Sequence, residues 1–262
     1  MCQREAGNSG AIWRRELTLE IKAILLDLDD TLLGNDINGF IDNYLPLLAS
    51  YVSPHIDPRI FVDELMNGTQ AMIDNTNPAL TNAEVFWSVF YQRTGLNRAA
   101  FEPTVDEFYR KEFGKLRPLT RRIPEATEMI EFCIEQGFRV VIATNPLFPL
   151  TAIEQRLDWA GLPVTNYRYD LVTSYENMHA SKPHREYYNE ILSKVGAPPE
   201  YSIMVGDDWS NDIEGASQAG LYSFWIKQPD DDSSKVQPGL AGSGTLGEFF
   251  QILTRGDIQL AE

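Results

Sequence analysis

Cysteine, histidine and positive charge are all scarce in this chain of 262 residues. The two cysteines, Cys2 and Cys133, form no Cys-x-x-Cys pair, so neither a disulfide framework nor a cysteine-based zinc site can be built. The three histidines, His55, His179 and His184, share no metal-ligand spacing. Lys and Arg total 22 against 38 Asp and Glu, a formal net charge of -16, which disfavours binding to the phosphate backbone of a nucleic acid.

Long apolar runs are missing as well. No stretch approaches the ~20 consecutive apolar residues of a membrane span. Residues 1–20 include Arg4, Glu5 and Arg14 and hold no apolar core like that of a signal peptide. We therefore expect a cytoplasmic protein with neither a nucleic-acid polymer nor a membrane as partner. The oligomeric state and the role of residues 1–20, an N-terminal extension, stay open.

Five short apolar segments are typical of strands buried on both faces of a sheet. They are Ala23–Leu26, Arg139–Ala143, Asp170–Thr173, Ser202–Val205 and Tyr222–Ile226. Apolar residues at helical spacing predict the helices between them, at about residues 125–136, 151–160, 183–195 and 211–219. Strands that alternate with single helices predict an α/β fold, a Rossmann-like parallel sheet with helices on both faces.

Two local signals refine this outline. Thr151-x-x-Glu154 has the pattern of a capping box and predicts the start of a helix. The polar and glycine-rich stretch at residues 228–244 predicts a surface loop, with Gly242-Ser243-Gly244 as a flexible connector before a last short helix at about residues 246–253.

The stretch from Leu33 to Pro118 is far longer than one crossover between strands needs. Its apolar residues recur at helical spacing between Asn, Pro and Gly breaks, which predicts an inserted helical bundle at residues 33–118. The core domain would then comprise residues 21–32 and 119–262. Basic side chains of the insert could bind a second anionic group of a ligand: Arg59, Arg93, Arg98, Arg110, Lys111, Lys115 and Arg117.

Two carboxylates, Asp27 and Asp29, stand two residues apart where the first predicted strand ends. Aspartate disfavours strands, so this placement indicates either a turn or a site. An EF-hand calcium loop fits poorly, because its sixth and twelfth positions counted from Asp27 are Leu32 and Asn38 in place of Gly and Glu. Taken alone, the motif leaves the turn and the site open.

Polar residues also follow the other predicted strands. Thr144-Asn145 follows the second strand, Lys182-Pro183 the third, and the run GDDWSND at residues 206–212 the fourth. The ligand crevice of such a sheet lies beyond the carboxyl ends of its strands. The strand ends therefore predict one pocket built from all of these segments.

Several aspartates would meet in this pocket: Asp27, Asp29 and Asp207, with Asp208 as a further candidate. Two like charges ~4 Å apart repel by about 4 kcal/mol at an effective dielectric constant near ~20, so a cation must offset them. Oxygen ligands without His or Cys select a hard ion, and one or two carboxylates with waters and a substrate phosphate are the usual arrangement for magnesium. We therefore predict Mg²⁺ as the cofactor.

The four segments appear in the order DLDDT (27–31), TN (144–145), KP (182–183) and GDDWSND (206–212). With them the chain resembles the haloacid dehalogenase-like hydrolase superfamily, and the resemblance spans residues 21–226. It implies a phosphatase-type member whose helical insert is a cap that closes over the crevice. The hinges of that cap would lie at about residues 33–38 and 115–120.

The resemblance also implies roles for single residues. Asp27 would attack phosphorus and form an aspartyl-phosphate that water hydrolyses. Asp29 would protonate the leaving alcohol and then activate water, with nearby carboxylates making its proton harder to remove. Thr144 and Lys182 would bind and neutralise the phosphoryl group, and Asn145 would orient the substrate. Because phosphatases and mutases keep an aspartate where Asp29 stands, dehalogenation is disfavoured.

The metal ligands follow from the same resemblance. They would be one oxygen of Asp27, the backbone carbonyl of Asp29 and the side chain of Asp207. Either Asp208 or Asp212 would hold waters bound to the metal, and the resemblance does not decide between these two.

The function predicted from these residues is Mg²⁺-dependent hydrolysis of a small phosphorylated metabolite. A closing cap leaves little room for a phosphoprotein. One alternative is a phosphotransferase or phosphomutase that uses the same residues. Another is a noncatalytic ligand-binding relative that keeps only the fold.

Overall fold

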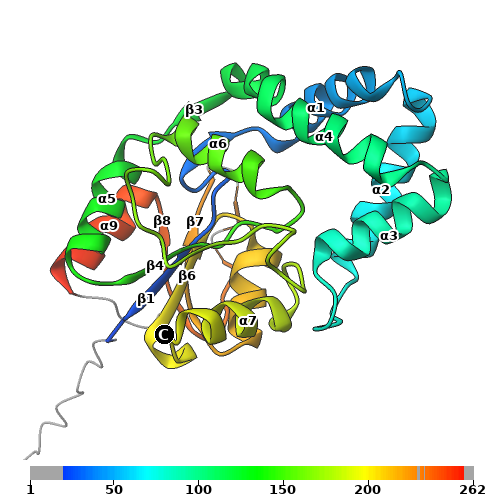
Figure 1. Cartoon of the computed structure of the whole chain (residues 1–262). Coiled ribbons are helices and arrows are strands. Elements are labelled where there is room, and N and C mark those ends of the chain that lie inside the picture. The colour runs from blue at the N-terminus through cyan, green and yellow to red at the C-terminus, as the bar shows by residue number, and fades with distance from the viewer. Residues whose placement is uncertain (1–19, 229–230, 233, 257–262) are drawn as a thin grey trace, which may run out of the picture.

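The computed structural model describes residues 20–228, 231–232 and 234–256. Apart from Glu20, the N-terminal extension expected from the sequence lies outside the described residues. Figure 1 shows a sheet with helices around it and, beside this core, an arch of helices that carries the labels α1 to α4. None of the helices that the structure describes has the length and apolar character needed to cross a membrane.

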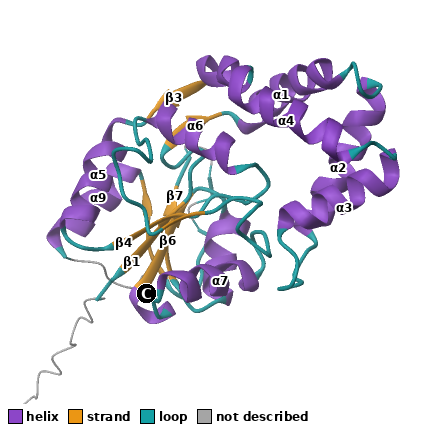
Figure 2. Cartoon of the chain, in the orientation of Figure 1, coloured by secondary structure: helices purple, strands orange, loops and turns teal. Residues whose placement is uncertain are grey.

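Six parallel strands form the central sheet, in the order β5-β4-β1-β6-β7-β8. Figure 2 shows strands of this sheet in orange, with helices around them. They are β1 (Ala23–Leu26), β4 (Arg139–Ile142), β5 (Leu171–Val172), β6 (Ser202–Gly206), β7 (Tyr222–Ile226) and β8 (Leu240–Gly244). The five predicted strands are therefore present. Strand β1 pairs with β4 on one side and with β6 on the other, so the motif that follows β1 emerges from the middle of the sheet.

Alternate residues of β1 point to opposite faces, and helices cover both of them. Ile24 and Leu26 pack into a core with α5 (Pro124–Glu135), α6 (Leu150–Ala160) and α9 (Leu246–Arg255). Ala23 and Leu25 pack on the other face with α7 (Arg185–Val195) and α8 (Gly215–Gln218). Each face buries apolar side chains of the kind that alternation along a strand supplies. This confirms the predicted Rossmann-like α/β fold.

Four α-helices occupy the insert predicted at residues 33–118. They are α1 (Ile37–Val52), α2 (Pro58–Ile73), α3 (Asn82–Thr94) and α4 (Arg98–Lys111), and a 3-10 helix at Phe113–Leu119 follows them. Aromatic rings hold them together: the centroids of Phe61 and Phe90 lie 5.9 Å apart, and those of Phe90 and Phe101 lie 5.4 Å apart. Aromatic pairs at such distances add to the stabilisation from buried area.

Two short strands join the insert to the core. Strand β2 (Leu33–Asn35) pairs antiparallel with β3 (Thr120–Arg122), so the two connecting segments are hydrogen-bonded to each other. The sequence analysis assigned hinges to this region and no strands, because three-residue strands carry too little pattern to be seen. The hydrogen bonds between β2 and β3 thus connect the segment that leads into the insert with the segment that leads out of it.

The prediction of a surface loop up to residue 244 was wrong at its end. Leu240–Gly244 forms β8 and pairs with β7 at the edge of the sheet. Its sequence LAGSG lacks the β-branched and aromatic residues that mark strands, so the pattern gave no signal. Close packing explains the glycine at position 242: a Cβ there would lie 3.0 Å from the ring of Phe224, which packs over this position.

Two predicted helix starts also differ from the structure. No capping box forms at Thr151, because α6 begins one residue earlier, at Leu150, and the Glu176 carboxylate accepts the Leu150 N–H at 3.0 Å instead. The helix expected at residues 211–219 begins as a π-helix at Trp209–Glu214 and continues as α8. The carboxylate of Glu176, which is distant from Leu150 in sequence, thus accepts a backbone N–H at the start of α6. The local sequence pattern suggested this kind of role for Glu154.

Candidate active site

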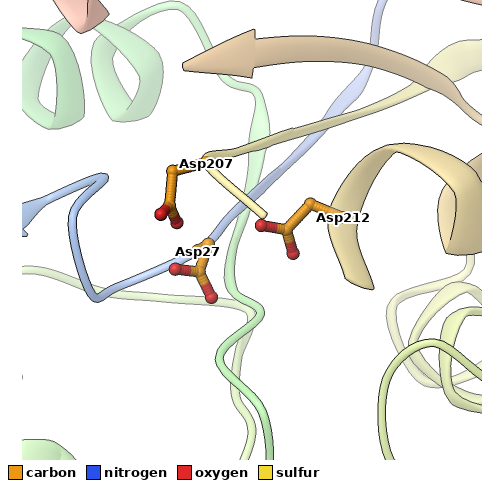
Figure 3. A group of neighbouring side chains, drawn as sticks. All are labelled: Asp27, Asp207 and Asp212. Atoms are coloured by element: carbon orange, nitrogen blue, oxygen red, sulfur yellow. The ribbon is translucent and has the colours of Figure 1, made fainter. Parts of the chain in front are cut away.

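The ends of β1 and β6 bring the first and last motifs together. The Asp27 N–H donates to the carbonyl of Val205 at 2.9 Å, so Asp27 continues the ladder between the two strands by one residue. Asp207 follows β6 directly. Figure 3 shows Asp27 and Asp207 at these strand ends and Asp212 on the adjacent helical turn, with the three carboxylates turned toward one another.

All eight residues predicted for the site line one cavity of about 290 Å³. They are Asp27, Asp29, Thr144, Asn145, Lys182, Asp207, Asp208 and Asp212. The cavity is also lined by Arg156, which the sequence analysis did not single out. The topology therefore assembles the four separate segments at one edge of the sheet, as parallel strands with crossover helices require.

Three of these carboxylates form a cluster. One oxygen from each of Asp27, Asp207 and Asp212 can be chosen so that all three lie within 4.8 Å of one another. Burial raises the pKa of Asp207 to about 8, and repulsion from Asp27 adds to the effect. Burial also raises the pKa of Asp212 to about 7, although Lys182 opposes this. The three carboxylates therefore carry more negative charge than the neighbouring Lys182 neutralises.

Lys182 is the cation of the cluster. Its Nζ lies 2.6 Å from Oδ1 of Asp27 and 2.6 Å from Oδ1 of Asp212. Burial alone would lower the pKa of this ammonium, but Asp212 and Asp27 hold the pKa of Lys182 well above its ordinary value. Its backbone N–H donates to Oδ1 of Asn145 at 3.3 Å, so Asn145 helps to position the segment that carries the lysine.

The structure separates the roles of Asp208 and Asp212. Oδ1 of Asp208 accepts the backbone N–H of Asn211 at 2.8 Å and caps the following helical turn. Asp212 is fully buried in the cluster, and its Oδ2 accepts the Asp208 N–H at 3.1 Å. The carboxylate of Asp212 lies so close to Gly206 that a Cβ there would overlap it. Glycine at this position is what allows Asp212 to reach the other two acids.

Asp29 has different neighbours from those expected. Its carboxylate forms an ion pair with the guanidinium of Arg156, and its Oδ1 accepts a hydrogen bond from Nδ2 of Asn35 at 2.9 Å. The family resemblance implies carboxylates beside Asp29 that hold its proton. In the structure the charged neighbour of Asp29 is a cation, the guanidinium of Arg156.

Arg156 is the site residue that sequence reasoning missed. It lies on α6, and its side chain is buried. The guanidinium carbon lies 5.7 Å from the ring centroid of Phe40 and 5.5 Å from that of Phe148, and burial lowers the pKa of Arg156 to about 10. A signal was available: Arg156 stands three residues after Ile153 and four before Ala160, so it shares their apolar helix face.

Thr144 is held through its backbone. Its carbonyl accepts hydrogen bonds from Tyr187 Oη at 2.8 Å and from Thr173 Oγ1 at 2.7 Å. Both donors are buried, which fixes the main chain where β4 ends. The Thr144 side chain is thereby left to line the cavity.

The parallel sheet and the buried acidic cavity at its carboxyl edge define an α/β enzyme with chemistry at the strand ends. The family model described as haloacid dehalogenase-like hydrolase matches residues 21–220, and the chain belongs to this family. This confirms the family predicted from the four motifs and the prediction of an enzyme.

Curated relatives and solved structures agree with this assignment. A glyceraldehyde 3-phosphate phosphatase of Methanothermobacter thermautotrophicus is 26% identical over 216 residues, which cover 79% of this chain and 85% of that protein. A haloacid dehalogenase-like hydrolase domain-containing protein 3 of Xenopus laevis is 30% identical over 105 residues, 40% of each chain. The crystal structure of a HAD phosphatase from Thermococcus onnurineus superposes with a TM-score of 0.56 at 21% identity, over 89% of this chain and 98% of that one. This last likeness concerns the fold.

Proposed function

We propose that this protein is a Mg²⁺-dependent phosphatase that hydrolyses a small phosphomonoester through an aspartyl-phosphate on Asp27. The observation that carries the proposal is the position of Lys182, whose Nζ lies 2.6 Å from both Asp27 and Asp212 in a buried cluster of three carboxylates. Carboxylates arranged around one lysine can bind a cation and a phosphoryl group side by side.

The phosphatase class rests on the family and on the relatives. A phosphatase that matches 79% of this chain is among them, so the chain is an enzyme of the phosphatase type, as predicted. That relative acts on a small sugar-derived phosphate, by its name. A small phosphorylated metabolite is accordingly the substrate class that we propose. The cytoplasmic location stays a prediction.

The residues present fit a hard divalent cation. Asp27, Asp207 and Asp212 offer three carboxylate oxygens within 4.8 Å of one another, and Lys182 supplies only one positive charge to them. In our proposal these side chains hold Mg²⁺, together with the backbone carbonyl of Asp29. Mg²⁺ supplies a charge that offsets the carboxylates and the phosphoryl oxygens when it is bound.

The reaction would then proceed in two displacements at phosphorus. One oxygen of Asp27 forms a bond to phosphorus while the bond from phosphorus to the alcohol oxygen breaks, and protonated Asp29 gives its proton to the leaving oxygen. The carboxylate of Asp29 next takes a proton from water as the water oxygen attacks phosphorus. This step releases inorganic phosphate and restores Asp27.

Other residues of the cavity would bind and orient the phosphoryl group. The ammonium of Lys182 neutralises charge that builds up on the phosphoryl oxygens and is held in place by two carboxylates before substrate binds. Thr144 would donate its hydroxyl to a phosphoryl oxygen, and Asn145 would orient the substrate beside it. Because these groups are positioned in advance, little reorganisation is needed during the reaction.

We further propose that residues 33–118 act as a cap. Ile37 and Ile41 of α1 line the acidic cavity together with the core residues, so the insert already forms part of its wall. A wall of apolar side chains over the acids keeps bulk water away from the aspartyl-phosphate.

Release of inorganic phosphate tests the proposal. The protein is incubated with a panel of phosphomonoesters, with Mg²⁺ and with a chelator, and Asp27→Asn is compared with Asp42→Asn, an exposed aspartate of α1 outside the cavity. We expect turnover only with Mg²⁺, and a loss on the order of 10³-fold or more for Asp27→Asn alone. No phosphate from any ester, or a normal rate in Asp27→Asn, would refute the phosphatase. An isomerised phosphate in place of free phosphate would indicate a mutase.

A further inference from the structure

A second cavity lies directly beside the acidic one. It has a volume of about 230 Å³ and is enclosed by the helices of the insert and by core residues that include Leu147 and Phe148. Ile41, Leu147 and Phe148 line both cavities, so the two spaces share a wall. We call the second cavity the apolar chamber.

Charge is absent from the apolar chamber. Among the described residues that line it, none is acidic or basic. Seven basic residues of the insert were candidates for binding a second anionic group, but in the described chain none of the seven lines either cavity. Four of them form ion pairs with glutamates of the insert: Arg93, Arg98, Lys111 and Lys115.

Three of the polar side chains in the wall of the chamber are already paired. The hydroxyls of Tyr44 and Tyr109 lie 2.6 Å apart and hydrogen-bond to each other. The hydroxyl of Thr69 donates to a main-chain carbonyl of the preceding helical turn at 2.9 Å. A sugar hydroxyl or a second phosphate placed beside these paired groups would lose its water and gain no free partner from them, which is costly.

We propose that the apolar chamber binds the alcohol portion of the substrate, and that the substrates are phosphomonoesters of an apolar aromatic or branched aliphatic alcohol. This inference rests on the proposed phosphatase function, and it assigns the leaving group. The phosphoryl group lies against Asp27 and Lys182, and the alcohol extends past Ile41 and Phe148 into the chamber. Apolar cavities of ~150 Å³ in proteins bind benzene, so a chamber of about 230 Å³ accepts one aromatic ring with a short substituent.

Relative specificity is the first test. We expect kcat/KM for benzyl phosphate to exceed that for glycerol 1-phosphate and for glyceraldehyde 3-phosphate by about tenfold or more, the discrimination that an apolar pocket provides. Equal or higher kcat/KM for the two polar esters would overturn the assignment of the chamber while leaving the phosphatase intact.

A matched pair of variants on α2 tests the location. Met66 lines the chamber and is 52% exposed, whereas Ile60 is 53% exposed on the same helix and lines neither cavity. Both sites reach solvent, so Met66→Asp and Ile60→Asp should fold equally well. We expect Met66→Asp to raise KM for benzyl phosphate about fivefold or more relative to its effect on KM for glycerol 1-phosphate, because a charge at the chamber disfavours apolar ligands more than polar ones. Ile60→Asp should change neither. The same response in both variants, or none, would overturn the proposal.

Binding of an alcohol without phosphate separates this inference from the function on which it rests. p-Cresol is titrated by calorimetry into Asp27→Asn protein and into the double variant Asp27→Asn, Met66→Asp. We expect binding that weakens about fivefold or more in the double variant. Cresol binding without hydrolysis of any ester would refute the phosphatase and keep the apolar site. Phosphate release without cresol binding would refute the apolar site and keep the phosphatase.

Discussion

Arg156 forms an ion pair with Asp29. It lies on α6, a helix that begins well over a hundred residues after Asp29 in the chain. The guanidinium is buried between the rings of Phe40 and Phe148, whereas 22% of the Asp29 side chain is exposed to the cavity. The pair joins the insert, through Phe40, to the carboxylate proposed as the acid and base of the reaction. Arg156 is thus a positioning residue for Asp29.

Arg156→Met tests this relationship. Methionine keeps much of the apolar packing but leaves Asp29 without its cation, so we expect the free energy of unfolding to fall by about 1–3 kcal/mol. The expected loss is below the ~3–5 kcal/mol of a fully buried pair, because water reaches Asp29. The control is Arg139→Met, since Arg139 pairs with Asp170 at 3.3 Å with both side chains well exposed, and it should cost less than ~1 kcal/mol. Urea unfolding measures both, and equal losses would contradict the role assigned to Arg156.

Asp212 and Asp208 are expected to differ in their effect on Mg²⁺ binding. Asp212→Asn removes one carboxylate from the buried cluster and should weaken Mg²⁺ binding by about 10–100-fold. Asp208→Asn should change the affinity less than about threefold, because Asn caps a helix as well as Asp does and the capping role of Asp208 is kept. Calorimetric titration of Mg²⁺ into both variants decides the matter. A larger effect from Asp208→Asn would show that it holds the metal site.

The positions of the acids could be predicted from the sequence because few geometries are available to a parallel sheet. Once Asp27 and Asp207 were each placed directly after a buried strand, their meeting followed from the topology. Asp212 could not be distinguished from Asp208 in this way, because the choice depends on the π-helical turn and on the space left by Gly206. That turn is set by tertiary contacts, which local sequence does not encode.

Other features depend on contacts between segments far apart in the chain. Arg156 occupies an apolar helix face, and only the structure shows that a carboxylate lies opposite it. The apolar chamber has the same origin, since aromatic residues at helical spacing predict a packed core and do not reveal where the packing leaves space. Strand β8 had no composition to mark it and forms because the edge of β7 is there to pair with.

The stability of the metal-free protein should fall as pH rises from about 4 to about 8. Burial raises the pKa of Asp207 to about 8 and of Asp212 to about 7, from an ordinary value of 3.8. Over this range the folded protein binds more protons than the unfolded chain, so removing protons favours unfolding. Above about pH 8 both states have lost these protons and the dependence on these groups levels off.

Mg²⁺ should oppose this loss, because ligands release their protons when they bind a metal. We expect the increase in Tm on adding Mg²⁺ to be larger at pH 8 than at pH 5.5. The matched variant Asp207→Asn removes one of the two raised groups and should flatten the pH dependence of the metal-free protein. A metal-free protein that is more stable at pH 8 than at pH 5.5, with no change in Asp207→Asn, would contradict the prediction.

Asn82 provides the last prediction, because it anchors the tip of the insert beside Lys182. Its side chain is fully buried, and its Nδ2 lies 3.0 Å from Oγ of Ser181 and 3.3 Å from the carbonyl of Ala180. Ser181 directly precedes Lys182, so the insert contacts the core beside this lysine as well as through the two segments that join them. A cap that opens only at the ladder of β2 and β3 would have to break these buried bonds.

Asn82→Ala should therefore lower the free energy of unfolding by about 1–3 kcal/mol and loosen the tip of the insert. We expect faster hydrogen exchange at residues 72–84 and a reduced rate of phosphate release, because Ser181 loses a bond that fixes the segment of Lys182. The control is Asn43→Ala, whose exposed side chain donates only to the carbonyl of Gly39 at 2.8 Å and should cost less than ~0.5 kcal/mol. Unchanged exchange and activity in Asn82→Ala would mean that the contact is a consequence of closure and does not hold the insert in place.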